Sequence, residues 1–149
     1  MEFDKLSGSI LKALQENARS SFAEIGRKVG LSAPAVAERI QKLEEAKVIR
    51  GYHVDIDPQK LGYSLQALVM FESRNGKSSA FAEYIATVCE VTECHRVTGT
   101  YCFVFKIAVQ SSQHLDKLIN SFSEYGEPTT SVILSSPVAP RIFIQNGSR

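Results

Sequence analysis

The amino-acid sequence predicts an α+β protein with two domains, because its helix-like and strand-like patterns are segregated along the chain. Apolar residues recur with helical spacing over the first fifty residues, whereas strand-like and helix-like segments alternate from residue 63 onward. Between these regions, Asp57-Pro58 interrupts both patterns. We therefore expect a helical domain over residues 1–50, a linker hairpin over 51–62 and an αβ-sandwich domain over 63–145.

Two helices are expected before residue 30. The first runs from about Asp4 to Asn17, and its predicted buried residues are Ile10, Leu11 and Leu14. The second begins at the capping box Ser21-Phe22-Ala23-Glu24, in which the Ser21 hydroxyl and the Glu24 carboxylate each accept a backbone N–H. Its expected buried face is Phe22, Ile25, Gly26 and Val29.

A third helix follows after a tight turn. Gly30 ends the second helix, since glycine accepts the positive φ required there. Ser32 caps the third helix, and Pro34 is tolerated in its first turn, where N–H groups have no intrahelical partner. The predicted buried stripe is Val36, Ile40 and Leu43. Three short helices, two of them joined by a glycine turn, indicate a helix-turn-helix of the winged-helix type.

The segment from Val48 to Ile56 alternates in strand fashion around Gly51 and stops at Asp57-Pro58. This pattern predicts a wing-like hairpin that links the two domains.

The rest of the chain predicts four strands and two helices. The strands are Tyr63–Glu72, Val91–Thr98, Tyr101–Val109 and Thr130–Ser135; the helical faces are Phe81, Tyr84, Ile85 and Val88, then Leu115, Leu118, Ile119 and Phe122. The order βαββαβ is that of a ferredoxin-like sandwich, with both helices on one side of the sheet. Because nothing else in the chain is long enough to cover the other side, we expect a second copy to cover it.

Composition and charge argue against several classes of protein. The formal net charge is +1, and the longest apolar run, Ala67-Leu68-Val69-Met70, is far shorter than the roughly 20 residues of a membrane span. The acidic N-terminus lacks the basic lead of a signal peptide. The three cysteines form no C-x-x-C pair, which argues against a disulfide framework or a zinc ribbon. We expect a soluble, cytoplasmic protein with no membrane contact.

Residues 19–50 carry a local excess of positive charge. Seven basic and four acidic residues give this stretch a net charge of +3. Such a surface suits a polyanion, although helical surfaces often carry as much by chance.

The chain resembles the Lrp/AsnC (leucine-responsive/asparagine-operon) family of transcriptional regulators over nearly its whole length. The matching runs are Gly30-Leu31-Ser32, Val36, Glu38-Arg39-Ile40, Leu43-Glu44-Glu45-Ala46, Val48–Tyr52, Asp57-Pro58 with Leu61-Gly62, and Val97–Cys102. The resemblance implies a bacterial or archaeal regulator that binds double-stranded DNA, dimerises through its sheet domain and often forms octamers. Many such proteins respond to amino acids.

The resemblance also implies an effector-binding turn, and here the sequence departs from the family. The implied effector residues are Thr98, Gly99, Thr100, Tyr101, Cys102 and Thr130. Thr100 and Cys102 replace acidic residues that usually flank the tyrosine. A carboxylate is the natural partner of an amino-acid ammonium group, so these replacements favour a different ligand or none. Lys47 replaces a glycine after the third helix but can adopt the left-handed conformation at modest cost.

Helical geometry predicts which residues of the third helix face DNA. At 100° per residue, Pro34, Glu38, Gln41 and Glu45 lie opposite the buried stripe. Gln41 suits an adenine, Glu38 accepts from a cytosine amine, and Pro34 or Ala35 contacts a thymine methyl group. Few donors and two carboxylates predict modest direct readout, with DNA bending and shape contributing. The full expected DNA-binding set is Arg27, Lys28, Ser32, Ala33, Pro34, Ala35, Glu38, Arg39, Gln41 and Lys42.

Five of these residues are candidates for phosphate contacts: Ser32, Arg27, Lys28, Arg39 and Lys42. Arg39 projects close to the buried edge of its helix, so pairing with an acid of the same chain, such as Glu16, competes with a phosphate contact.

Two alternative functions remain open at this point. A low-specificity architectural protein that bends or wraps DNA fits the weak readout face. A decarboxylase acting on siroheme-type tetrapyrroles shares the two-domain form, but it needs histidine and basic residues lining a cavity, for which the sheet domain offers only His95, Arg96 and Lys106. His53, His95 and His114 lack metal-ligand spacing, so we expect no catalytic residue, metal or cofactor. The operator, the target genes, the sign of regulation, the effector and the choice between dimer and octamer do not follow from the sequence.

Overall fold

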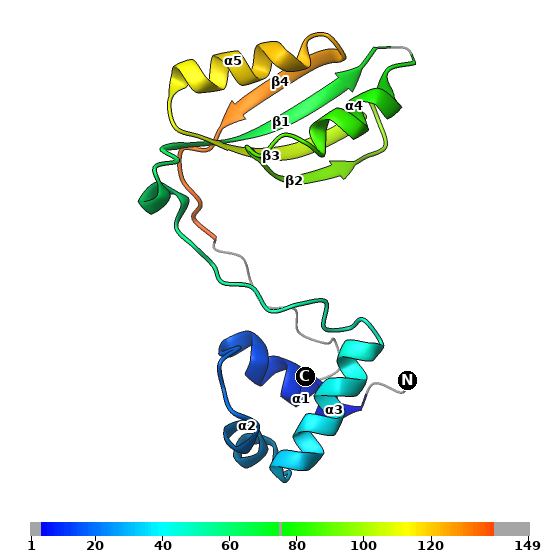
Figure 1. The fold of residues 1–149 in the computed structure, drawn as a ribbon, viewed down its shortest axis with the longest axis vertical. Coiled ribbons are helices and arrows are strands. Elements are labelled where there is room, and N and C mark those ends of the chain that lie inside the picture. Colours follow the sequence, from blue (N-terminus) through cyan, green and yellow to red (C-terminus); the bar gives the residue numbers. More distant parts are fainter. Residues whose placement is uncertain (1–3, 75, 139–149) are drawn as a thin grey trace. The chain divides into compact units, whose positions relative to one another are not determined.

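The structure is a computed structural model that describes residues 4–74 and 76–138, and its chain divides at Asp55 and Ile56 into two compact units. The first unit contains the helices α1 (Lys5–Glu16), α2 (Phe22–Val29) and α3 (Ala33–Glu45) (Figure 1). The second contains η1 (Pro58–Leu61), β1 (Leu65–Ser73), α4 (Ser78–Ile85), β2 (Val91–Arg96), β3 (Phe103–Val109), α5 (Ser112–Phe122) and β4 (Gly126–Val132). Residues 139–145 of the predicted second domain lie outside the described residues.

The side-chain caps of α2 and α3 form where the sequence predicts them. The Glu24 N–H donates to Ser21 Oγ at 3.2 Å, and the Ser21 N–H donates to Glu24 Oε2 at 2.7 Å, which completes the capping box of α2. Ser32 Oγ accepts the N–H of Ala35 at the start of α3. These bonds satisfy N–H groups that a helix leaves without partners at its start.

The turn between α2 and α3 requires glycine at two positions. Gly30 has a φ of +75°, which a side chain rarely adopts. A Cβ on Gly26 would lie 2.4 Å from the carbonyl oxygen of Leu31, so only glycine allows this close approach. The N–H groups of Gly30 and Leu31 both donate to the Gly26 carbonyl, at 2.8 and 2.9 Å. The predicted glycine turn is therefore confirmed.

A small apolar core holds the three helices together. Its buried members are Ile10, Ala13, Leu14, Ile25, Val36 and Ile40. The predicted stripe of α3 is confirmed, because Val36, Ile40 and Leu43 are all buried. Three residues of the expected buried faces are less buried than predicted: Leu11 and Val29 are only half-buried, and Phe22 is 45% exposed. Phe22 is the first residue of α2, where the chain has not yet turned fully onto the core.

The second unit has the predicted βαββαβ order, in an antiparallel sheet with strand order β2-β3-β1-β4. The last strand begins at Gly126, not at Thr130 as the sequence predicted. Glycine and proline usually argue against a strand. Here Pro128 lies on the edge strand β4, opposite Phe71 of β1, where a missing N–H is tolerated.

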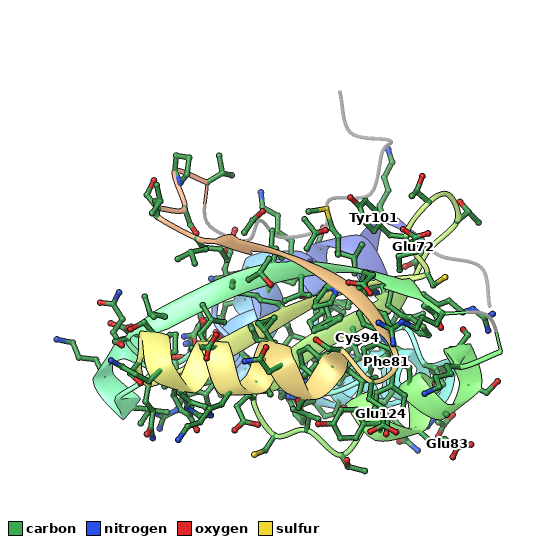
Figure 2. The ribbon with its side chains drawn as sticks, turned by 90° about the horizontal axis from the view of Figure 1, so that it is seen from above. Glu72, Phe81, Glu83, Cys94, Tyr101 and Glu124 are labelled. Atoms are coloured by element: carbon green, nitrogen blue, oxygen red, sulfur yellow. The ribbon has the colours of Figure 1, made fainter. Side chains whose placement is uncertain are left out.

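Both helices of this unit cover the same face of the sheet (Figures 1 and 2). Aromatic rings dominate this core: Phe81 of α4 stacks on Phe71 of β1 with ring centroids 3.8 Å apart and meets Phe122 of α5 edge-on at 5.9 Å. The opposite face has no helix over it among the described residues. It presents Leu68 with 43% of its area exposed.

The predicted linker hairpin was wrong. Residues 50–57 form no helix or strand in the described chain, and η1 then begins at Pro58. Alternation alone does not make a strand, because each strand needs a neighbour to accept and donate its backbone hydrogen bonds. The apolar side chains of this segment are correspondingly open to solvent, with Val54 82% and Ile56 55% exposed.

Candidate functional site

The outward face of α3 is the one that the sequence predicted. Pro34, Glu38, Gln41 and Glu45 are all exposed, opposite the buried stripe. Ala33 and Ala35 are half-buried at the start of the helix, so they present less surface than expected. The face is therefore polar, with small residues near its N-terminal end.

Each polar donor on this face contacts a carboxylate one turn away. Lys42 Nζ lies 2.6 Å from Glu38 Oε1, and Gln41 Nε2 donates to Glu45 Oε1 at 2.8 Å. The hydrogen bond from Lys42 and its charge lower the pKa of Glu38, so this carboxylate is ionised at neutral pH. Exposed pairs of this kind contribute only about 0.3–0.5 kcal/mol to helix stability. These contacts nevertheless mean that the donors of Lys42 and Gln41 already have partners within the helix.

Arg39 points away from this face and joins α3 to the start of α1. Its Nη1 lies 2.7 Å from Asp4 Oδ2 and donates to Ser7 Oγ at 3.3 Å. The acid that the sequence analysis suggested, Glu16, was wrong; Glu16 lies 3.9 Å from Lys28 instead. Asp4 caps α1 and is brought against Arg39 by helix packing, which the sequence alone does not show.

Asp4 is the most strongly perturbed carboxylate of this surface. It accepts the N–H of Ser7 at 2.8 Å as the cap of α1. This backbone hydrogen bond, the Ser7 hydroxyl and the Arg39 guanidinium together lower its pKa from 3.8 to about 2. The Ser7 hydroxyl is buried, so the bond from Arg39 also satisfies a polar group that would otherwise be costly to bury.

Two further cations lie at the end of α2. Arg27 forms no ion pair with the described residues, and Lys28 has only the long contact with Glu16. Hydrogen bonds from Ser21 lower the pKa of Glu24, and the charges of Arg27 and Lys28 add to this effect. Ser32 Oγ accepts from Ala35, which leaves its hydroxyl proton available to an acceptor. Arg27 is thus the least engaged of the predicted phosphate ligands.

The C-terminal end of α3 is tied to the linker by a contact that the sequence analysis missed. The Tyr52 hydroxyl donates to Glu44 Oε1 at 2.8 Å. Burial and the nearby carboxylate raise the pKa of Tyr52 to about 12. Lys47 has a φ of +56°, as the sequence predicted for this position. The spacing between Glu44 and Tyr52 crosses a helix end, so no helical periodicity points to this pair.

The predicted effector turn lies between β2 and β3. Gly99 has a φ of +114°, and the N–H of Cys102 donates to the Phe71 carbonyl at 2.8 Å, which joins the turn to the end of β1. Glu72 is the next residue of β1, and it lies near Tyr101 at the same end of the sheet (Figure 2). The turn between β2 and β3 thus contains five of the six predicted effector residues, Thr98, Gly99, Thr100, Tyr101 and Cys102.

Thr130 is not part of this group within one chain. It lies on β4, at the edge of the sheet opposite β2, and pairs with Val69. Its hydroxyl oxygen is buried with no hydrogen-bond partner among the described residues. The sequence placed it with the turn only through the family resemblance.

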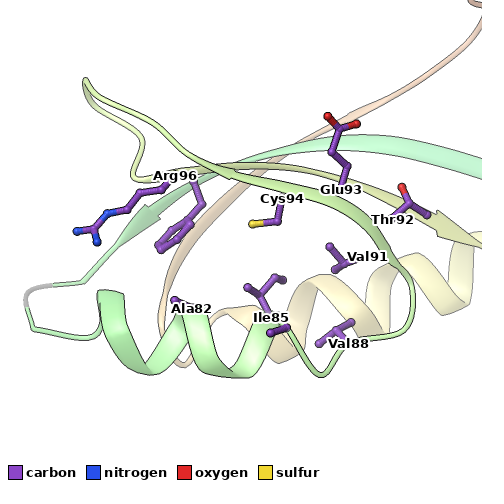
Figure 3. A pocket seen from close by; sticks show the side chains of 10 residues that line it. Ala82, Ile85, Val88, Val91, Thr92, Glu93, Cys94 and Arg96 are labelled. Atoms are coloured by element: carbon purple, nitrogen blue, oxygen red, sulfur yellow. The ribbon is translucent and has the colours of Figure 1, made fainter. Parts of the chain in front are cut away.

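A shallow groove runs between α4 and β2, with Cys94 pointing into it and Arg96 at one end (Figure 3). Burial raises the pKa of the Cys94 thiol, which keeps it protonated. The groove is lined by Ala82, Ile85, Ala86, Val88, Val91, Thr92, Glu93, Cys94, Arg96 and Phe103. None of the predicted effector residues belongs to it.

The three residues named for the tetrapyrrole-enzyme alternative are divided between the two faces of the sheet. Arg96 pairs with Phe103 on the helix-covered face, whereas His95 pairs with Val104 and Lys106 pairs with Leu68 on the opposite face. Within the described residues, no three His, Cys, Asp or Glu side chains are placed to hold a metal ion together. In the same part of the chain, no helix is long and apolar enough to span a membrane.

Sequence comparison relates the chain to a family of regulators. Residues 3–44 match the AsnC-type helix-turn-helix domain, and residues 66–142 match the Lrp/AsnC ligand binding domain. The HTH-type transcriptional regulator LrpC of Bacillus subtilis is 33% identical over 91% of this chain and 94% of its own length. The regulatory protein AsnC of Escherichia coli K12 is 30% identical over 91% and 92%.

Structural comparison agrees with the sequence matches. The structure of B. subtilis LrpC superimposes with a TM-score of 0.89 at 32% identity, covering 94% of this chain and all of that one. A feast or famine regulatory protein of M. tuberculosis, solved in complex with L-methionine, gives a TM-score of 0.85 at 26% identity, covering 96% and 99%.

The Asp4–Arg39 pair predicts a specific pH dependence of stability. An Asp4→Asn variant keeps a capping side chain but loses the charge that pairs with Arg39. Because the pKa of Asp4 in the folded protein lies below its ordinary value, its charge stabilises the fold above about pH 3.8, and this contribution is lost as the pH falls through about 2. The melting temperature of the variant should therefore lie below that of the wild type at neutral pH and converge with it near pH 2.

Thermal unfolding of both proteins across this pH range measures the effect. Asp55→Asn serves as the control, since Asp55 lies in the linker and forms no ion pair with the described residues. A difference between wild type and Asp4→Asn that stays constant down to pH 2 would contradict the assignment.

Proposed function

Because the chain belongs to the Lrp/AsnC family of DNA-binding transcriptional regulators, we propose that α3 is its recognition helix and that a dimer or larger assembly is its active form. In this proposal, residues 1–50 bind DNA, and residues 63–145 mediate assembly and bind a small-molecule effector. Activity is assigned to the cytoplasm, where the DNA lies.

The exposed face of α3 is the observation that carries the proposal. A helix-turn-helix inserts the N-terminal part of its second helix into the major groove. In that part Pro34 and Glu38 are exposed on the outward side, and Gln41 follows on the same side in the C-terminal half of α3. Gln41 is the residue best suited to read a base, because its amide pairs with adenine in two directions. The phosphate contacts fall to Arg27, Lys28, Ser32 and Lys42, while Arg39 holds α3 against α1.

Substitution of Arg27 or Lys28 tests this interface. Each change to Gln should weaken binding to DNA from upstream of the protein's own gene and to a scrambled duplex alike, because phosphate contacts carry no sequence information. The slope of log K against log salt should fall by about one for each lost contact. Gln41→Ala should instead reduce the preference between the two duplexes by about 1–3 kcal/mol.

Lys117→Gln is the control, because Lys117 is exposed on α5 and its substitution also removes one positive charge. It should leave the salt slope unchanged. Equal binding of the wild type to both duplexes would favour the architectural alternative, since phosphate and shape would then dominate. Absence of wild-type binding to either duplex at low salt would refute DNA recognition by this face.

The uncovered face of the sheet supports a dimer. Leu68 is 43% exposed at the centre of this face, between Lys106 of β3 and Ser131 of β4. A second copy placed on it would bury apolar area that the single chain leaves in water. A dimer presents two recognition helices to half-sites about 34 Å apart or a multiple of that distance. An octamer would bring several dimers to one DNA and add avidity.

A Leu68→Glu substitution tests the dimer. In one chain the new carboxylate lies opposite Lys106 and in water, so folding should be retained. In the dimer it would be buried at a cost of about 3 kcal/mol or more, which weakens association at least ~100-fold. Analytical ultracentrifugation should show the wild type at twice the chain mass or more and the variant at the chain mass. Ser79→Glu on the exposed side of α4 should not change the mass, and a Leu68→Glu variant that still associates would exclude this face.

We propose that the effector is an amino acid and that Glu72 replaces the carboxylates missing from the turn as the partner of its ammonium group. The turn 98–102 provides no carboxylate, but the Cys102–Phe71 backbone bond places Glu72 beside it, and Glu72 forms no ion pair with the described residues. A carboxylate here suits an ammonium group. The L-methionine complex of the related M. tuberculosis regulator supports the same ligand class.

L-methionine should therefore raise the melting temperature of the wild type. A ligand at 100 times its Kd stabilises the folded state by about 2.7 kcal/mol, which corresponds to several degrees. Glu72→Gln should abolish most of the shift, whereas Glu83→Gln on α4 should keep it. A wild type that shows no shift with millimolar L-methionine would exclude this effector, and a full shift in Glu72→Gln would exclude the role of Glu72.

A further inference from the structure

The recognition helix carries its own competitors for DNA. Two outward donors of α3, Lys42 and Gln41, are each held by a carboxylate four residues away on the same helix. We propose that Glu38 and Glu45 are affinity-limiting residues, because DNA must displace them from Lys42 and Gln41 before those donors reach phosphate or base. The inference rests on the proposed function of α3.

Both members of each pair are exposed on the outward side of α3. The side chains of Lys42 and Glu38 are 58% and 67% exposed, and their contact of 2.6 Å is a hydrogen-bonded ion pair. An ammonium group that turns toward a phosphate leaves Glu38 without its partner. Gln41 has two N–H donors, and one of them is held by Glu45 at 2.8 Å. A bidentate contact with adenine requires that amide to be reoriented.

The charges act in the same direction as the contacts. Glu38 and Glu45 are exposed acidic side chains on the surface that would face the phosphate backbone, which carries one negative charge per roughly 1.7 Å of duplex. Each carboxylate therefore weakens DNA binding in two ways. It repels phosphate, and it holds a donor that could otherwise contact DNA. A single α3 then binds weakly, and strong binding requires two or more copies on the same DNA.

Glu44 offers a comparison within the same helix. It carries the same charge as Glu38 and Glu45 and is also exposed, but its carboxylate accepts from the hydroxyl of Tyr52 in the linker. Its removal changes the charge of α3 equally without releasing Lys42 or Gln41. The Glu44→Gln variant thus separates the loss of a negative charge from the release of a donor.

The test is equilibrium binding of the full-length protein to two duplexes across a salt series, the first from upstream of the protein's own gene and the second a scrambled sequence. Glu38→Gln should tighten binding to both duplexes about 5- to 10-fold at moderate salt, with a salt slope steeper by about one, as expected for one added phosphate contact. Glu44→Gln should change binding by about twofold or less. In a Lys42→Gln background, the gain from Glu38→Gln should shrink to that of Glu44→Gln.

The second pair has a different expected signature. Glu45→Ala should raise the preference for the upstream duplex over the scrambled one, because it releases a group that reads bases and not phosphates. This gain should disappear in a Gln41→Ala background. Circular dichroism and thermal midpoints of every variant establish that the helices are intact before affinities are compared.

Each of the following outcomes would overturn the inference. Weaker binding of Glu38→Gln to the upstream duplex would mean that Glu38 contacts a base directly. Equal gains from Glu38→Gln and Glu44→Gln would mean that only net charge matters, and a gain that persists in the Lys42→Gln background would mean that Lys42 is not the released donor. If neither the wild type nor Glu38→Gln binds either duplex at low salt, the proposed function fails as well; if the wild type binds and Glu38→Gln binds no more tightly, only this inference fails.

Discussion

The burial of one stripe of α3 is the constraint on which the proposed DNA-binding surface depends. Val36, Ile40 and Leu43 are fully or almost fully buried, and helical geometry then fixes every other residue of α3 to a known direction. The turn at Gly26 and Gly30 brings α2 against this stripe, and the Arg39–Asp4 pair joins α3 to α1. The orientation of the outward face is thus a consequence of packing on the inward one.

The polar side chains of α3 fall into two groups, those that hold the helix in place and those that point outward. Arg39, at the edge of the buried stripe, is engaged by Asp4 and Ser7 and so acts as a positioning residue. Lys42 and Gln41, on the open side, contact the exposed carboxylates of Glu38 and Glu45. In the proposed complex, association of several copies through the uncovered sheet face would supply by avidity the affinity that one α3 lacks.

The sequence predicted local features well and contacts between distant residues poorly. The capping box at Ser21 and the glycine turn at Gly30 were predictable because both depend on residues within one helical turn. The order of elements along the chain, βαββαβ, followed from the periodicity. The start of β4 at Gly126 did not, since an edge strand tolerates the proline that argues against a central strand. The hairpin failed because alternation does not specify a partner strand.

The candidate site shows the same contrast between local features, which the sequence predicts, and contacts between distant residues, which it does not. The outward residues of α3 follow from helical spacing alone, whereas the partner of Arg39 depends on the packing of α1 against α3, and Asp4 is 35 residues away in the chain. In the second unit, the sequence shows that Thr100 and Cys102 lack the charge for an ammonium group, but not that Glu72 lies beside them. That proximity depends on one backbone hydrogen bond between Cys102 and Phe71, which joins the turn to a strand that comes much earlier in the chain. The turn itself carries no carboxylate, but the sheet brings the carboxylate of Glu72 on β1 beside it.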